Sequence, residues 1–357
     1  MHTDALLDGL DRGDITALAR AISLVENQRD GFERVLAHVH ERVGRRGARR
    51  LGITGPPGAG KSTLTEQLTR QFRAQGLRVA VVAVDPTSPF SGGALLGDRI
   101  RMESVSLDPS VFIRSMATRG SVGGLATTTE EVCDVLDAFG FDRILIETVG
   151  VGQTELDVAR TAETTVLVLV PESGDSIQTL KAGVMEVADI FVINKSDRPG
   201  ADRLRQEIEV TQGIRRGNAF RHVPPHHARH TRSDRLDPSI RPSATDGESF
   251  RVHPPEWEPP VLATVASKGE GVAELVEALE RHRAYLEAGS RLATRRRERL
   301  AERTRAVVDR ALQQWIWEQS AAGDVLAQEL DGMAEGRRSP YDVAAGILDM
   351  VKSGATR

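Results

Sequence analysis

The sequence has little that would link it to an oxidising compartment, a membrane or a nucleic acid. Its 357 residues include one cysteine, Cys133, which excludes an intramolecular disulfide and favours a reducing compartment. No apolar run approaches the roughly 20 residues that a membrane-spanning helix needs. The N-terminal stretch MHTDALLDGLDRGD lacks the apolar core of a signal peptide. A net charge of −4 gives no reason to expect nucleic acid as a partner. We therefore expect a cytoplasmic protein in which Cys133 is a small buried residue.

Seven short apolar runs recur along the middle of the chain, and helical segments separate most of them. Each run is continuously apolar rather than alternating, which is typical of strands buried on both faces of a sheet. Strands that alternate with helices in this way predict a mainly parallel, doubly wound α/β sheet. The runs are LGIT (51–54), VAVVAV (79–84), VFIR (111–114), RILIE (143–147), TVLVLV (165–170), IFVIN (190–194) and PVLATV (260–265).

Helical segments flank the α/β region. Near the start, Asp14 is a candidate N-cap before an apolar face at helical spacing, and near the end Ser339 precedes a proline as at a helix start. We expect an N-terminal helical extension (1–47), an α/β domain (48–285) and a C-terminal helical arm (286–357).

One stretch inside the α/β domain has a different composition. Residues 213–260 hold eight of the sixteen prolines and five of the nine histidines, with few apolar residues. Such a composition is typical of a long surface loop or a partly disordered insertion. We place this insertion at about residues 213–258.

The stretch GPPGAGKST, directly after the first apolar run, fits the pattern G-x-x-x-x-G-K-[ST] between a strand and a helix. Glycines let backbone N–H groups approach phosphate oxygens, and the next helix adds its free N–H groups. Lys61 would neutralise β- and γ-phosphate charge, and the Ser62 hydroxyl would face Mg²⁺. An ordinary Gly-Pro turn is the alternative, but the full motif in context favours a P-loop NTPase. The residues concerned are Gly55, Gly58, Ala59, Gly60, Lys61, Ser62 and Thr63.

A second motif, INKSD at residues 193–197, follows a later strand and resembles the N-K-x-D signature of GTPases. Asp197 could accept hydrogen bonds from guanine N1–H and its exocyclic amine, whereas adenine would leave the carboxylate unpaired. In such enzymes the lysine, here Lys195, lies along the base, and the asparagine, here Asn194, braces the phosphate loop. A turn capped by Asp197 is the alternative. Behind a phosphate loop, the motif favours GTP and GDP over ATP.

Three acids stand where a magnesium site is expected. Mg²⁺ prefers about six oxygen ligands, usually one or two carboxylates with phosphates and water. Asp85 and Glu147 end strands, and Asp98 lies in a following loop. Glu147 takes the place of the aspartate in D-x-x-G, and Gly150 keeps the fourth position, where its N–H could sense the γ-phosphate.

Hydrolysis of GTP requires an oriented water and charge stabilisation. Gln153 could orient the water, with an exposed loop residue as the alternative, and Lys181 could reach the phosphates or a partner. With no evident arginine finger, we expect slow Mg²⁺-dependent turnover that a partner accelerates.

The strings GPPGAGKST, VDPTSPFSGGALLGDRIRM (84–102) and ETVGVGQTE (147–155) resemble the methylmalonyl-CoA mutase-associated GTPase family of the MeaB/ArgK type. The resemblance covers most of residues 1–212 and resumes at PPVLATVASKGEGVAEL. It implies a GTP-dependent chaperone of an adenosylcobalamin-dependent acyl-CoA mutase, which gates cofactor loading and protects the mutase from inactivation. It also implies a homodimer formed through the C-terminal helices. By the same resemblance, Asp85, Asp98 and Glu147 match the metal-linked acids, and residues 172–181 match a mobile segment that responds to the partner.

The chain departs from the family pattern at two places. Family members carry a Ser-Ala pair after the last strand to steady the guanine, whereas this chain has Val265, Ala266 and Ser267. A backbone contact could survive there without the serine hydroxyl. The insertion at 213–258 is also longer than the family connection.

Two other functions remain open from the sequence. A metal-delivery GTPase would use the imidazoles of the insertion, namely His222, His226, His227 and His230, which could bind Zn²⁺ or Ni²⁺. Their irregular spacing and the lack of a cysteine partner favour a flexible polar loop instead. An ATP-dependent protein kinase is an older label for the family, but no H-R-D or D-F-G motif supports it.

Overall fold

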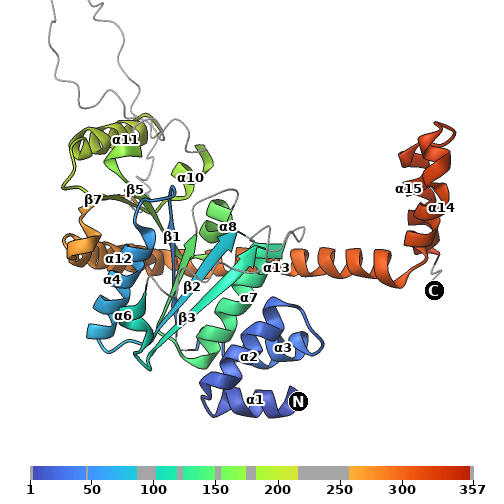
Figure 1. Ribbon diagram of the computed structural model, residues 1–357, viewed down its shortest axis with the longest axis horizontal. Coiled ribbons are helices and arrows are strands. Elements are labelled where there is room, and N and C mark those ends of the chain that lie inside the picture. Colours follow the sequence, from blue (N-terminus) through green and yellow to red (C-terminus); the bar gives the residue numbers. More distant parts are fainter. Residues whose placement is uncertain are drawn as a thin grey trace, which may run out of the picture.

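A computed structural model describes residues 3–45, 47–86, 102–118, 124–148, 154–173, 182–215 and 257–353. Its centre is a seven-stranded sheet with the order β3-β2-β4-β1-β5-β6-β7, in which every neighbouring pair is parallel (Figure 1). The strands are β1 (Arg49–Thr54), β2 (Val79–Pro86), β3 (Val111–Thr118), β4 (Arg143–Thr148), β5 (Thr164–Leu169), β6 (Ile190–Asn194) and β7 (Val261–Thr264). All seven apolar runs are strands, so the predicted doubly wound α/β fold is confirmed.

Both faces of the sheet are covered, which is why the strands are continuously apolar. Along β4, Leu145 belongs to the core on one face, while Ile144 and Ile146 belong to the core on the other. The first face packs against α4 (Lys61–Ala74), α6 (Glu103–Ser106) and α12 (Val272–Glu287). The second packs against α7 (Gly124–Phe139) and α8 (Thr154–Thr161). A third cluster joins β5 and β6 to α10 (Ala182–Val187) and α11 (Ala201–Arg215).

The N-terminal helices α1 (Thr3–Asp11), α2 (Ile15–Glu26) and α3 (Phe32–His40) extend the core of the second face. Asp14 caps α2 as predicted, because its carboxylate accepts a 2.8 Å hydrogen bond from the Thr16 N–H. Leu18 and Ile22 on α2 are fully buried in one cluster with Leu136 of α7. The N-terminal helices therefore pack directly on the sheet domain.

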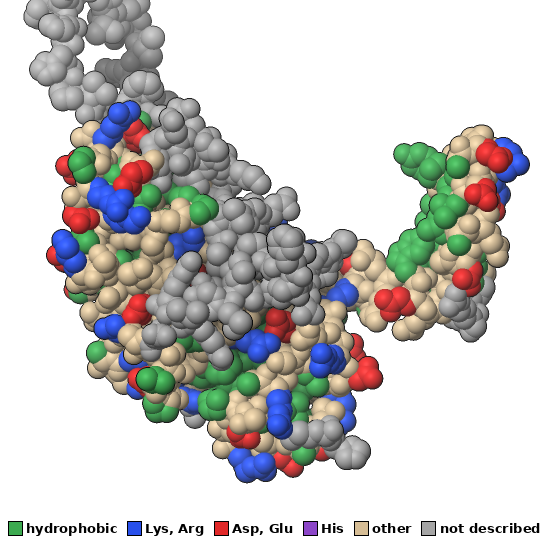
Figure 2. Space-filling view, viewed as in Figure 1, with side chains coloured by type: hydrophobic (Ala, Val, Ile, Leu, Met, Phe, Trp, Pro, Cys, Tyr) green, Lys and Arg blue, Asp and Glu red, His purple; other side chains and the backbone are tan. Residues whose placement is uncertain are grey.

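A long helix, α13 (Arg291–Gln314), follows α12 after a 3-10 turn (Ala288–Ser290) and then leaves the sheet domain (Figure 1). It continues as a π-helical turn (Trp315–Gln319) and a hairpin of α14 (Ala322–Ala334) and α15 (Pro340–Lys352). Ser339 and Asp342 form a capping box at the start of α15. Hydrophobic side chains gather along one side of this hairpin (Figure 2). The predicted C-terminal helical arm is present.

Some details differ from the sequence-based prediction. β5 begins one residue earlier than expected, and α11 extends to Arg215, past the predicted start of the insertion. Trp257, which the sequence analysis places in the insertion, packs instead against the domain, where its indole N–H donates a 2.7 Å hydrogen bond to the Asp189 carbonyl.

Cys133 is buried as predicted, and burial raises the pKa of its thiol to about 12. Within the described ranges, no helix is both long and apolar enough to cross a lipid bilayer.

Candidate functional site

The candidate site lies at the carboxyl ends of the parallel strands. β1 ends at Thr54, directly before the glycine-rich stretch, and β6 ends at Asn194, which opens the N-K-x-D motif. Glu147 stands one residue before the end of β4. Because parallel strands end at one edge of a sheet, segments distant in the sequence meet there.

The phosphate loop requires glycine at two positions. Gly55 has a φ of 139°, and a Cβ there would lie 2.1 Å from the Val168 carbonyl oxygen. Gly60 has a φ of 87°, and a Cβ there would lie 2.3 Å from Nδ2 of Asn194. α4 begins at the next residue, so its N-terminal N–H groups are directed at this loop. The backbone fits an anion cradle that only glycine permits.

Lys61 is the cation of the loop. Its side chain is buried against the loop, and its ammonium donates to the carbonyls of Gly55 at 2.7 Å and Pro56 at 3.0 Å. The charge is thus held over the cradle, where a polyphosphate would meet it.

Ser62 and Glu147 meet beside the loop. The serine hydroxyl donates a 2.5 Å hydrogen bond to Oε1 of Glu147, and Glu147 is only 1% exposed. A hydroxyl and a carboxylate side by side are oxygen donors of the kind that Mg²⁺ prefers. This donor set fits the metal site predicted for the two residues.

Asn194 connects three segments of the site. Its Nδ2 donates to the Ala59 carbonyl at 2.8 Å, which is the contact expected of a residue that braces the phosphate loop. Its Oδ1 accepts from the Ala266 N–H at 3.0 Å and from the Thr264 hydroxyl at 3.2 Å. A single buried amide therefore links the phosphate loop, the end of β6 and the turn after β7.

Lys195 and Asp197 lie in the same turn. Lys195 adopts a φ of 56°, uncommon for a residue with a side chain, and its ammonium donates to the Gly58 carbonyl at 2.9 Å. The exposed Asp197 carboxylate lies 3.8 Å from the Lys268 ammonium. Lys268 was not predicted from the sequence. The sequence signal that could have identified Lys268 is its position two residues after Ala266 in VASKGEG.

The turn after β7 has a different role for each residue. Val265 and Ala266 are buried, and the Ser267 side chain is exposed. The backbone N–H of Ala266 is the group that points into the site, toward Asn194. In the stretch that stands in place of the family Ser-Ala pair, the serine hydroxyl is therefore on an exposed side chain.

Several predicted residues are not brought together by the described structure. Asp85 is the next-to-last residue of β2, but only its backbone is described, and Thr63 is exposed in the first turn of α4. The others lie outside the described residues: Asp98, Gly150, Gln153, Lys181, and the four histidines His222, His226, His227 and His230.

This combination of a parallel sheet, a glycine-dependent phosphate loop and a buried asparagine from an N-K-x-D turn defines a P-loop GTPase. The chain belongs to the methylmalonyl Co-A mutase-associated GTPase MeaB family, whose model matches residues 18–321.

Several curated proteins are similar over most of the chain. A Pyrococcus abyssi protein with a provisional GTPase name is 42% identical, covering 98% of this chain and 97% of its own length. The GTPase ArgK of Escherichia coli is 33% identical and covers 82% of this chain and 80% of its own. The mouse methylmalonic aciduria type A homolog, a mitochondrial protein, is 35% identical and covers 82% of this chain and 66% of its own.

Among solved structures, one described as a LAO/AO transport system kinase superposes with a TM-score of 0.62. It is 24% identical and covers 98% of this chain and 97% of its own. At this identity the likeness supports the fold.

Proposed function

We propose that this protein hydrolyses GTP in order to act as a chaperone of an adenosylcobalamin-dependent acyl-CoA mutase, methylmalonyl-CoA mutase or a close relative. In this role it gates cofactor loading and protects the mutase from inactivation. The observation that carries the proposal is the family match over residues 18–321, together with the phosphate and guanine loops joined by Asn194.

Guanine recognition is assigned to the turns after β6 and β7. Asp197 accepts from N1–H and the exocyclic amine, while the stem of Lys195 lies along the base. The N–H of Ala266, which donates to Asn194 Oδ1 at 3.0 Å, is the backbone group assigned to this site, and Val265 and Ser267 complete the turn. The Lys268 ammonium lies 3.8 Å from the Asp197 carboxylate.

Phosphate binding is assigned to the loop from Gly55 to Thr63. Backbone N–H groups and Lys61 neutralise the triphosphate, and Ser62, Glu147, Asp85 and Asp98 are the proposed oxygen donors to Mg²⁺. When bound, Mg²⁺ neutralises developing charge on the phosphate oxygens. The 2.5 Å hydrogen bond between the Ser62 hydroxyl and the Glu147 carboxylate places two of these oxygen donors side by side.

Hydrolysis is assigned to the segment after β4. Gly150 would sense the γ-phosphate through its N–H, Gln153 would orient the attacking water, and Lys181 would act at the phosphates or at the partner. With no arginine assigned to the transition state, the intrinsic rate is low and the mutase raises it.

We further propose a cytoplasmic homodimer. Residues 286–357 form the dimerisation arm, 1–47 the helical extension and 48–285 the GTPase domain with its insertion at 213–258. Metal delivery through that insertion is not favoured, since the family match concerns mutase-associated GTPases.

The test combines the chain with candidate acyl-CoA mutases. We expect co-elution with one mutase to depend on a non-hydrolysable GTP analogue, and the mutase to lose activity more slowly during turnover when the chain and GTP are present. A Lys61→Ala variant is the matched control without nucleotide binding. Equal protection by this variant would contradict the proposal.

A further inference from the structure

A cavity of about 320 Å³ lies between the sheet domain and the helical arm. The domain contributes α7 and Arg50 of β1, the arm contributes α13, and the segment after α3 closes another side. Arg50 stands five residues before Gly55, so the cavity is about 16 Å from the phosphate loop along the strand. Small-molecule pockets have volumes of roughly 300–1,000 Å³. The cavity is therefore large enough for a small ligand and separate from the nucleotide site.

The two helices at the cavity, α7 and α13, line it with side chains of opposite charge. On each helix the charged lining residues are three or four positions apart, which is the spacing of one helical face. The face of α7 is acidic and the face of α13 is basic, so opposite charges meet at the cavity. The residues are Glu130, Asp134 and Asp137 on α7, and Arg296, Arg299 and Arg303 on α13.

The charges of the lining balance. Apart from His40, they belong to four arginines and four acids, because Arg50 and Glu163 add one of each to the two helices. Some are already paired, since Asp134 accepts from Arg50 at 2.6 Å and from Arg303. Although burial opposes it, these two cations lower the pKa of the Asp134 carboxyl. Because neither sign is in excess, the cavity matches a ligand without net charge.

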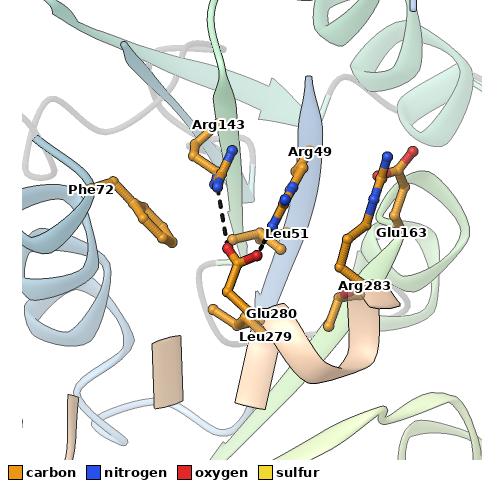
Figure 3. A pocket seen from close by; sticks show the side chains of 9 residues that line it. Arg49, Leu51, Phe72, Arg143, Glu163, Leu279, Glu280 and Arg283 are labelled. Carbon is orange, nitrogen blue, oxygen red and sulfur yellow. Dashed lines mark hydrogen bonds and ion pairs between the residues drawn. The ribbon is translucent and has the colours of Figure 1, made fainter. Parts of the chain in front are cut away.

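Glu163 is also fully engaged. Arg296 donates to its Oε1 at 2.5 Å, and Arg283 of α12, which lies beside it in Figure 3, donates to its Oε2 at 2.6 Å. A smaller hollow that Glu163 also lines, drawn in Figure 3, has a volume of about 10 Å³, roughly the space of one water molecule. The larger cavity is thus the one that can hold a ligand, and other residues must bind it.

Three charged groups of the lining lack a matching partner among the described residues. Asp137 is 4% exposed, and its Oδ1 has no hydrogen-bond partner, while its Oδ2 accepts from the Gly44 N–H at 3.1 Å. Glu130 has neither a hydrogen bond nor an ion pair within the described ranges. Arg299 donates to two backbone carbonyls but to no described carboxylate. The lining therefore offers two acceptors and one donor.

Burial disfavours the charged form of each of these groups. It raises the pKa of the Glu130 and Asp137 carboxyls and lowers the pKa of the Arg299 guanidinium. Buried polar groups are normally hydrogen-bonded, so a set without partners at a cavity indicates a ligand that supplies them. An ammonium group would satisfy the two carboxylates, and a carboxylate would satisfy the guanidinium.

We propose that this cavity binds a free α-amino acid, with Asp137 and Glu130 accepting from its ammonium group and Arg299 donating to its carboxylate. One ligand then supplies both charges and keeps the balance of the lining. Val43 and Leu300, which also line the cavity, give its side chain an apolar contact. The inference does not depend on GTP hydrolysis or on the mutase.

The first experiment titrates the full chain by calorimetry with each of the common amino acids, up to about 10 mM, where even millimolar affinity is detected. We expect at least one to bind. The amine that lacks its carboxylate and the acid that lacks its ammonium group should each bind at least about tenfold more weakly, because each loses a charged hydrogen-bonding group. No binding by any amino acid would overturn the inference. Equal binding by the amine or by the acid would also overturn it, because a simple cation or anion would then suffice.

Variants test whether the ligand lies in the cavity. Asp137→Asn removes the charge but keeps an oxygen for the Gly44 N–H, and it should weaken amino-acid binding about tenfold or more. Glu130→Gln should act in the same direction and serves if Asp137→Asn does not fold. Arg310→Ala is the matched control, because it removes a 2.9 Å ion pair of α13 with Glu131 of α7, outside the lining. It should keep amino-acid affinity within about twofold of the wild type.

GDP affinity separates this inference from the proposed function. All three variants should keep the GDP affinity of the wild type, because the phosphate loop is untouched. Unchanged amino-acid affinity in Asp137→Asn and Glu130→Gln, or an equal loss in Arg310→Ala, would overturn the inference. Failure of the wild type to bind GDP would instead overturn the proposed function and leave this inference standing.

Discussion

At the residue scale, the site depends on residues whose side chains or backbone could not be replaced without losing a contact. Asn194 uses its amide in both directions, as a donor to Ala59 and as an acceptor from Ala266 and Thr264. Position 60 requires glycine because Nδ2 of Asn194 occupies the space where a Cβ would project. The phosphate loop and the guanine turn are thus fitted to each other at one contact.

Replacing Gly60 with alanine tests this contact. The new Cβ would displace Asn194, whose lost hydrogen bonds cost about 1–3 kcal/mol each. We expect GDP affinity to fall about 5- to 150-fold, measured by calorimetry, which corresponds to the loss of one such hydrogen bond.

Gly76→Ala is the control, because Gly76 has a similar φ of 78° with nothing within 4 Å of a new Cβ. The Gly76→Ala variant should have the same kind of backbone strain as Gly60→Ala, and its GDP affinity should equal that of the wild type. Equal losses in both variants would mean that strain alone, and not the Asn194 contact, explains the effect.

At the element scale, the strands and the phosphate loop were predictable because their signals are local. Continuous apolar runs identify buried strands, and GPPGAGKST has one compatible fold between a strand and a helix. The role of α13 was not predictable, because the sequence RLATRRRERL resembles a solvated basic helix. Only the fold shows that Arg296 and Arg299 meet Glu163 and Ala162, more than 130 residues earlier. Lys268 was missed for the same reason, since its partner Asp197 is distant in the sequence.

The attachment of α1 to α3 predicts a pH dependence. Asp11 accepts hydrogen bonds from Arg42 and from His38 at 2.8 Å, and these lower the pKa of its carboxyl to about 2 from 3.8. A folded-state pKa below the unfolded value stabilises the fold above pH 3.8, and this stabilisation is lost as the pH falls toward 2. Because the carboxylate is 37% exposed, we expect a contribution below about 1 kcal/mol.

Urea unfolding of Asp11→Asn at several pH values checks this. The variant should be less stable than the wild type near neutral pH, and the difference should shrink as the pH falls from 3.8 through 2. Asp8→Asn, on the same helix without a side-chain partner among the described residues, should lower the stability near neutral pH less than Asp11→Asn does. A deficit of Asp11→Asn that kept its full size from neutral pH down to pH 2 would contradict the assigned cause.

At the scale of the whole molecule, the arm carries apolar surface away from the domain (Figure 2). Val308 and Leu312 of α13 are 50% and 48% exposed, and Trp317 is 50% exposed. Exposed apolar groups gathered on one element mark an interaction surface.

Leu312→Glu tests whether this surface joins two copies of the chain. A carboxylate placed in an apolar interface should weaken the dimer about tenfold or more, a change of about 1.4 kcal/mol, measured by analytical ultracentrifugation. Leu107→Glu is the control, because Leu107 is 90% exposed on the sheet domain. A dimer weakened equally by both variants would argue against the arm as the interface.

The central claim is that this site binds a guanine nucleotide through the phosphate loop and Asp197. The most direct measurement is calorimetric titration of the wild type and Asp197→Asn with GDP, ADP and xanthosine diphosphate. We predict that the wild type prefers GDP to ADP by at least about 100-fold, because adenine leaves the carboxylate unpaired. Asp197→Asn should instead prefer xanthosine diphosphate, since its amide can donate to the carbonyl that replaces the guanine amine. Equal affinity of the wild type for GDP and ADP, or unchanged base preference in the variant, would contradict the claim.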